Sequence, residues 1–247
     1  MTRLPLRDAA ADLLLGSACV GCARPGRVLC RDCRGGLDPQ PAPRWPDPVP
    51  AGLAVPWAAA EYAGLARALV LGHKERGLRP LREPLALLLA ASVQAAVADL
   101  AGPVVLVPVP SRPAAIRDRG QDATAVLVRA AARVLRRRGV PATAVPLLAV
   151  RGTVADQSGL DADGRFANLD GSMGVRAPRL RRLAAACSAA HAVVCDDVLT
   201  TGATAREAQR ALEAVGVEVA AAATAAATRR RGPPLPRGRL SCSGWTD

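Results

Sequence analysis

Aromatic residues are nearly absent from this chain, whose 247 residues include only three tryptophans, one tyrosine and one phenylalanine. Proteins that bind single-stranded nucleic acid by stacking need aromatic platforms, so this sequence gives that mode of binding little support. Lysine is equally scarce, because Lys74 is the only lysine among 33 Lys and Arg residues. The net charge of +12 therefore comes from arginine, and net charge alone is weak evidence for a polyanionic partner.

The chain also lacks an apolar run long enough to cross a bilayer. Its longest apolar stretch, Leu85–Leu100, is broken by Ser92, Gln94 and Asp99, whereas a membrane span needs about 20 consecutive apolar residues. We expect this stretch to form a buried helix with Pro84 near its first turn. The sequence therefore predicts no membrane insertion and a soluble, cytoplasmic protein.

Two familiar nucleotide-binding patterns are missing as well. Neither G-x-x-x-x-G-K-[ST] nor G-x-G-x-x-G after a strand occurs in the sequence. Their absence excludes a P-loop and the usual dinucleotide-binding fingerprint.

Four cysteines near the N-terminus are spaced as two Cys-x-x-Cys pairs. Each pair brings two thiolates onto one tight turn, and four soft ligands can close a structural zinc site without an open catalytic position. Because so short a segment has little core of its own, metal binding would supply much of its folding free energy. Disulfides are the alternative, which a cytoplasmic location disfavours. The expected zinc ligands are Cys19, Cys22, Cys30 and Cys33.

The most informative pattern lies between residues 191 and 208. The apolar run Ala192–Cys195 is typical of a strand buried on both faces, and Ala203–Val215 has the composition of a helix. Between them, two carboxylates precede a loop of small residues whose N–H groups and hydroxyls can close around a phosphate at the positive end of the helix dipole. The loop residues are Thr200, Thr201, Gly202 and Thr204.

Asp196 and Asp197 precede this loop, and they would repel a phosphate if they pointed toward it. We therefore expect them to accept hydrogen bonds from the vicinal hydroxyls of a ribose, with Mg²⁺ nearby. An ordinary strand-to-helix turn with threonine caps is the alternative.

The segment Val194–Thr204 resembles the PRPP-binding motif of type I phosphoribosyltransferases. Together with the cysteine pairs, it makes the chain similar to the ComF family, and matching pieces span Cys19 to Thr204. The resemblance implies that Asp196 and Asp197 are the catalytic carboxylates. It also implies that PRPP contacts Asp196, Asp197, Thr200, Thr201, Gly202, Ala203 and Thr204.

Other segments match the family on the pyrophosphate or acceptor side. The apolar run Val104–Pro110 predicts a second buried strand, after which transferases of this fold place the pyrophosphate loop. The Arg117-Asp-Arg-Gly120 segment resembles the family's R-x-R-G, and guanidinium groups suit a pyrophosphate leaving group. The residues implied on this side are Lys74, Ser111, Arg112, Arg117 and Arg119.

One of these segments departs from the family pattern, and another has an alternative interpretation. Where the family continues R-x-R-G with an aromatic, an asparagine and a glutamine, this chain has Gln121, Asp122 and Ala123. We expect Asp122 to cap a helix that runs to Arg138. Lys74 follows Tyr62 at the family's spacing, and a plain surface lysine is the alternative.

A segment rich in glycine and aspartate follows the strand expected at Ala144–Val150. Residues 151–168 lack helical periodicity, and a long loop in a compact domain is typical of a mobile hood that excludes water from reactive intermediates. A surface insertion is the alternative. The hood residues implied by the family pattern are Gln157, Leu160, Arg165 and Asn168.

These elements predict an α/β fold. Strands beginning near Val104, Ala144, Ala192 and Val217, separated by helices, favour a parallel sheet that binds ligand outside its carboxyl ends. We expect Trp57–Tyr62 to be an edge strand. The resemblance makes this a type I phosphoribosyltransferase fold with a small four-cysteine module. The expected parts are the module (residues 1–38), a proline-rich linker (39–56), the transferase-like domain (57–228) and a basic, disordered tail (229–247).

Two functions follow from the resemblance. The first is a phosphoribosyltransferase that uses PRPP and Mg²⁺, transfers phosphoribose to an unknown acceptor and releases pyrophosphate. The second is a non-catalytic PRPP-binding accessory protein for natural competence and DNA uptake, with single-stranded DNA or a competence helicase as its partner. A homodimer is compatible with both functions.

Overall fold

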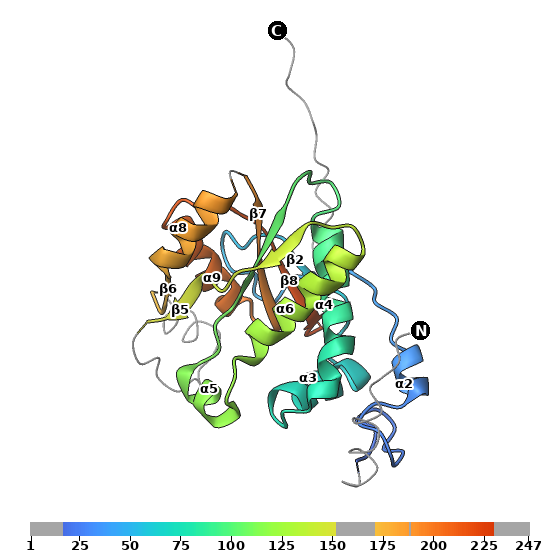
Figure 1. The fold of residues 1–247 in the computed structure, drawn as a ribbon. Helices are drawn as coiled ribbons and strands as arrows, with labels where there is room; N and C mark the ends of the chain where they lie inside the picture. The colour runs from blue at the N-terminus through green and yellow to red at the C-terminus, as the bar shows by residue number, and fades with distance from the viewer. Residues whose placement is uncertain (1–16, 152–170, 188, 230–247) are drawn as a thin grey trace.

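A mostly parallel six-stranded sheet forms the centre of the protein. The computed structural model describes residues 17–151, 171–187 and 189–229 (Figure 1). Within them the strands lie in the order β1-β2-β8-β7-β3-β4, and only β1 and β2 pair antiparallel. The strands are β1 (Ala42–Pro43), β2 (Pro56–Ala58), β8 (Val219–Ala227), β7 (His191–Leu199), β3 (Val104–Pro108) and β4 (Ala142–Ala144).

Helices cover both faces of this sheet, so the fold is a mixed α/β fold as the sequence predicts (Figure 1). On one face lie α3 (Gly64–Lys74), α4 (Arg82–Ala96) and α6 (Ala123–Arg137). The other face carries α9 (Ala203–Glu213), α8 (Ala177–Ala186) and a two-stranded hairpin of β5 (Leu148–Val150) and β6 (Met173–Val175). Three shorter elements are α2 (Arg31–Gly35), the 3₁₀ turn η1 (Arg79–Leu81) and α5 (Pro113–Arg119).

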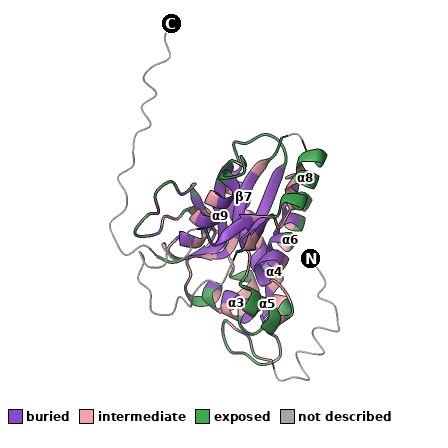
Figure 2. Ribbon diagram, turned by 90° about the vertical axis from the view of Figure 1, so that its left-hand side faces the viewer, coloured by how far each residue is buried: buried purple, intermediate pink, exposed green. Residues whose placement is uncertain are grey.

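The central strands are buried because both of their faces are covered (Figure 2). Every residue of β3 is buried, and Ala192 to Cys195 of β7 are buried as well. Such continuous apolar runs are typical of parallel strands between two helical layers. The helix predicted within Leu85–Leu100 is confirmed as α4, which begins at Arg82 and buries Leu85, Leu88 and Leu89 against the sheet.

The strand order of the sheet reverses between the parallel neighbours β3 and β7. From β3 the chain passes through α6 to β4 on one side, and from β7 it passes through α9 to β8 on the other. In open α/β sheets a ligand binds outside the carboxyl ends of the strands at such a switch point. The fold therefore predicts a ligand site at the ends of β3 and β7.

Two strand predictions are wrong in detail. Ala144–Val150 is not one strand, because β4 ends at Ala144 and β5 begins at Leu148 in a separate sheet. Pro146 lies between them, and proline cannot donate to a strand ladder. The strand expected at Trp57–Tyr62 is confined to Pro56–Ala58 and is not at the edge, since β1 pairs with it on the outer side.

The helix predicted to end at Arg138 is confirmed as α6, with Asp122 as its N-cap. The proline-rich segment contributes β1 to the sheet, although the domain boundaries stay predictions. In the described ranges, every helix is too short or too polar for a transmembrane segment.

Candidate functional site

The predicted phosphate loop connects the end of β7 to the start of α9. Gly202 is the residue before α9, and its φ of +75° lies in the left-handed region that favours glycine. A Cβ there would also stand 3.1 Å from Leu53 Cδ2, 3.1 Å from Pro46 Cγ and 3.2 Å from Pro50 Cγ. The hydroxyl of Thr201 accepts a hydrogen bond from the N–H of Ala203 at 3.4 Å. Gly202 is thus required by its backbone and by its neighbours alike.

A cavity of about 490 Å³ opens beside this loop at the switch point. It brings together predicted residues from four elements: Lys74 ends α3, Arg119 ends α5, Asp196 belongs to β7 and Thr204 to α9. Its charged lining is balanced, with three cationic and three acidic side chains. The lining residues are Lys74, Glu75, Val109, Pro110, Ser111, Arg112, Ala115, Asp118, Arg119, Thr124, Asp196 and Thr204.

The two adjacent carboxylates are not equivalent. Asp197 is buried, and its carboxylate accepts hydrogen bonds from Lys74 Nζ at 3.1 Å to Oδ1 and 3.0 Å to Oδ2. Asp196 lines the cavity, and its Oδ1 accepts from the N–H of Asp197 at 2.8 Å. Asp196 is therefore the carboxylate that borders the cavity, whereas Asp197 is paired with the Lys74 ammonium group.

The pKa values reflect this crowding of charge. Burial raises the pKa of Asp196 well above its usual value, and the neighbouring Asp197 raises it further. Burial alone would lower the pKa of Lys74, but the carboxylates of Asp197 and Asp196 outweigh burial and raise it. Lys74 therefore stays charged, and Asp196 is the group whose charge is costly until a cation or a hydrogen-bond donor reaches it.

The loop after β3 is fixed by Asp122. Its carboxylate accepts from Ser111 Oγ at 2.9 Å, from the Ser111 N–H at 3.3 Å and from the Ala125 N–H at 3.0 Å. Asp122 thus caps α6, as predicted, and also ties the following helix to the predicted pyrophosphate loop. No pattern in the sequence indicates this second role of Asp122.

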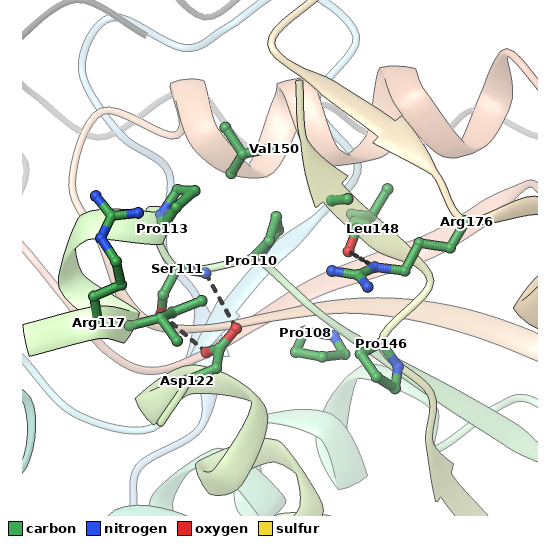
Figure 3. A pocket seen from close by; sticks show the side chains of 12 residues that line it. Pro108, Pro110, Ser111, Pro113, Arg117, Asp122, Pro146, Leu148, Val150 and Arg176 are labelled. Atoms are coloured by element: carbon green, nitrogen blue, oxygen red, sulfur yellow. Dashed lines mark hydrogen bonds between the residues drawn. The ribbon is translucent and has the colours of Figure 1, made fainter. Parts of the chain in front are cut away.

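The two arginines of the R-x-R-G segment lie in different places. Arg119 lines the 490 Å³ cavity and donates from Nη1 to the Lys74 carbonyl at 2.7 Å and from Nε to the Ala115 carbonyl at 2.9 Å. Arg117 instead lines a second cavity of about 330 Å³, which Ser111 also lines (Figure 3). The two arginines thus line different cavities, which share Pro110 and Ser111.

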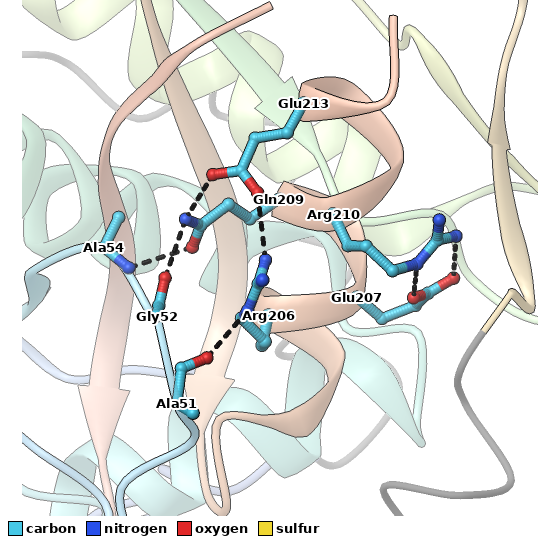
Figure 4. A network of polar contacts seen from close by, with 8 residues as sticks. All are labelled: Ala51, Gly52, Ala54, Arg206, Glu207, Gln209, Arg210 and Glu213. Atoms are coloured by element: carbon cyan, nitrogen blue, oxygen red, sulfur yellow. Dashed lines mark hydrogen bonds and ion pairs between the residues drawn. The ribbon is translucent and has the colours of Figure 1, made fainter.

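Polar contacts hold α9, and with it the loop, from two sides (Figure 4). Gln209 accepts from the N–H of Ala54 and donates to the carbonyl of Gly52, both at 2.9 Å. On the opposite side, the buried Glu207 accepts from the Met173 N–H at 2.8 Å and pairs with Arg210 at 2.6 Å. Segment 46–54 and strand β6 thereby fix the helix that presents the loop.

The other predicted loop residues differ in exposure. Thr200 is exposed, Thr201 is half-buried, and Gly202 and Ala203 are buried. Of the predicted loop residues, Thr204 lines the cavity. Arg112 also lines it and precedes Pro113 at the start of α5. The hood residues Gln157, Leu160, Arg165 and Asn168 lie outside the described residues.

The four N-terminal cysteines form one cluster. The Sγ atoms of Cys19, Cys22, Cys30 and Cys33 all lie within 4.8 Å of one another, which suits four thiolates around one zinc ion at about 2.3 Å each. Burial raises the pKa of Cys19, but backbone N–H groups of Cys30, Cys22 and Gly21 lower it to about 6. Such donors stabilise thiolate, which is the form that binds metal.

The cysteine cluster packs on α3. Cys19 and Cys30 belong to the same core cluster as Leu69 and Val70 of that helix. A Cβ on Gly21 would stand 2.8 Å from Leu65 Cδ1, so the first turn of the cluster lies directly against α3. The geometry is consistent with a structural zinc site that is continuous with the main core.

Sequence reasoning missed the ion pair between Lys74 and Asp197 and the acidic Glu75 and Asp118 in the cavity wall. The lone lysine in an arginine-rich chain was the available signal for the first. Glu75 and Asp118 belong to no sequence pattern that would have indicated a site.

Comparison of the chain with protein-family models and with curated proteins found no match.

Proposed function

We propose that this protein is a ComF-like phosphoribosyltransferase with a type I phosphoribosyltransferase fold, which binds PRPP and releases pyrophosphate. One observation carries the proposal: the two acidic residues near the end of β7, the loop after them and the start of α9 lie at the topological switch point of the sheet. There Asp196 and Thr204 face a cavity that Ser111, Arg112 and Arg119 also line. A sugar that carries a phosphate at one end and a pyrophosphate at the other matches this arrangement.

The chain's own residues divide the work of binding. The N–H groups at the start of α9 and the hydroxyls of Thr201 and Thr204 receive the 5′-phosphate. The carboxylate of Asp196 accepts hydrogen bonds from the ribose hydroxyls, which positions the ring. Arg112 and Arg119 face the pyrophosphate side and stabilise the charge that develops on the leaving group.

In this proposal Lys74 acts through Asp197. Because it is paired with Asp197, it fixes the carboxylate next to Asp196 and keeps a positive charge at the cavity wall. Asp196 supplies an oxygen ligand of the kind Mg²⁺ prefers, and Mg²⁺ would neutralise part of the pyrophosphate charge when it enters with PRPP. The acceptor nucleophile would then attack the carbon that loses pyrophosphate.

Calorimetric titration with PRPP and Mg²⁺ tests this proposal. Asp196→Asn removes the charge that orients the ribose, so PRPP affinity should fall at least tenfold, since hydrogen bonds to charged groups contribute about 1.5–3 kcal/mol. Asp118→Asn is the matched control, because it removes the same charge from the same cavity wall and should not weaken binding. Equal affinities in the wild type and Asp196→Asn would contradict the proposed role.

Pyrophosphate release separates the enzyme from its alternative. A transferase should release pyrophosphate when an acceptor is added to the protein with PRPP and Mg²⁺. PRPP binding without release under any acceptor, together with salt-sensitive affinity for single-stranded DNA, is the result expected of the accessory protein in DNA uptake.

A further inference from the structure

The second cavity is distinct in its chemistry from the proposed PRPP site. It has a volume of about 330 Å³, which is within the range of small-molecule sites. Its walls are mostly apolar, with prolines 108, 110, 113 and 146 and the buried side chain of Leu148. Proline rings are rigid, so these walls keep their shape whether or not a ligand is present.

Two arginines stand on opposite sides of this apolar floor (Figure 3). Arg176 is the N-cap residue of α8, and its Nε donates to the carbonyl of Leu148 at 3.0 Å. That hydrogen bond holds the guanidinium over the cavity. Arg117, on α5, has no side-chain hydrogen bond or ion pair with another described residue. Both guanidinium groups therefore offer N–H donors to a ligand.

The one acidic side chain in the wall, Asp122, offsets only one of these two positive charges. Both carboxylate oxygens of Asp122 already accept hydrogen bonds, from Ser111 and from the Ala125 N–H. The carboxylate is therefore directed toward the backbone of the loop and of α6. The cavity presents two cationic groups above an apolar floor, which favours an anion that carries an apolar body.

We propose that the 330 Å³ cavity is a second binding site, for a small planar organic anion. The ring system of the ligand lies on the prolines and Leu148, and its carboxylate is held between the side chains of Arg117 and Arg176, which reach it from opposite sides of the floor. A bare phosphate would leave the apolar walls unused, and a neutral aromatic would leave the arginines unpaired.

This site borders the proposed PRPP site, because Pro110 and Ser111 line both cavities. A ligand in the second cavity therefore contacts the same loop that faces the pyrophosphate side of the first. Occupancy of either cavity should change the affinity of the other through this loop. The binding itself, however, does not depend on the proposed function.

Titration of the full chain with 2-naphthoate tests the site, with 2-naphthamide and inorganic phosphate as comparison probes. We expect 2-naphthoate to bind at one site per chain and at least about tenfold more tightly than either comparison probe, because only it uses both the arginines and the apolar floor. Equal binding of naphthoate and naphthamide, or no naphthoate binding at all, would overturn the proposal.

Variants locate the binding. Arg117→Gln and Arg176→Gln should each weaken 2-naphthoate about tenfold, whereas the control Arg182→Gln, an exposed arginine on α8, should leave it unchanged. The Arg117 side chain has no hydrogen bond or ion pair with another described residue, so its variant keeps the test valid if Arg176→Gln loosens β5. Unchanged affinity in Arg117→Gln would refute the assignment. PRPP titration of the same samples shows separately whether the proposed function holds.

Discussion

The cysteine cluster differs from the carboxyl ends of the central strands in how the charge of its side chains is balanced. The cluster gathers four thiols in a small space, and Cys33 has its pKa raised to about 12 by its cysteine neighbours and by burial. At the carboxyl end of β7, the buried Asp197 is already paired with the positively charged Lys74 of α3. The four thiols of the first region therefore suit a metal ion, whereas the second region already contains the counter-charge of its buried carboxylate.

The largest effect should come from removing a metal ligand. Cys30→Ser should abolish zinc binding and lower the free energy of unfolding by at least about 3 kcal/mol, because Cys30 lies in the main core cluster as well as in the metal site. Metal analysis should give about one zinc per wild-type chain. Cys187→Ser, which lies outside the cluster, should keep both the zinc and the stability, and a metal-free wild type would contradict the account.

A smaller loss should follow from breaking the ion pair at the sheet edge. Lys74→Met leaves the buried Asp197 without its cation, and this should cost about 2 kcal/mol, below the 3–5 kcal/mol of a fully buried pair, because the Lys74 side chain is 37% exposed. Urea unfolding measures the loss. Arg67→Met on the exposed side of the same helix is the control and should be nearly neutral. Adding Asp197→Asn to Lys74→Met should restore part of the stability.

The loop can be compared with a glycine of the same backbone conformation. Gly202 and Gly216 have φ values of +75° and +78°, but only Gly202 has side chains close to a new Cβ. Gly202→Ala should therefore cost about 1 kcal/mol more than Gly216→Ala, as measured by thermal unfolding. Equal losses would mean that segment 46–54 does not pack on the loop.

The last prediction concerns the pH dependence of stability. Because the pKa of Asp196 is raised in the folded protein, the folded state binds this proton more tightly than the unfolded state. The contribution of Asp196 to stability therefore falls as pH rises from about 4, its ordinary value, through the folded pKa. In Asp196→Asn this decline should disappear, so the variant should gain stability relative to the wild type at pH 8 but not at pH 4. A difference that is independent of pH would contradict the raised pKa.

Local patterns predicted the parts of the molecule that depend on nearby residues. The cysteine spacing predicted the cluster because all four ligands lie on two adjacent turns. The cap at Asp122 and the glycine before α9 were also readable, since each is set by its own backbone.

The features that the sequence did not predict depend on contacts between segments that are far apart along the chain. The pairing of Lys74 with Asp197 joins residues 123 positions apart, and the packing of Pro46 and Leu53 on Gly202 joins the proline-rich segment to the loop. The separation of Arg117 from Arg119 follows from the orientation of α5, a helix that the sequence did not reveal. Spacing along the chain carries no information on such encounters.

A crystal structure with PRPP and Mg²⁺ tests the central claim most directly. The account predicts the 5′-phosphate at the start of α9, the ribose hydroxyls on Asp196, and the pyrophosphate toward Ser111 and Arg112. PRPP bound elsewhere, or a loop that stays empty while Lys74 keeps Asp197 and nothing reaches Asp196, would contradict it.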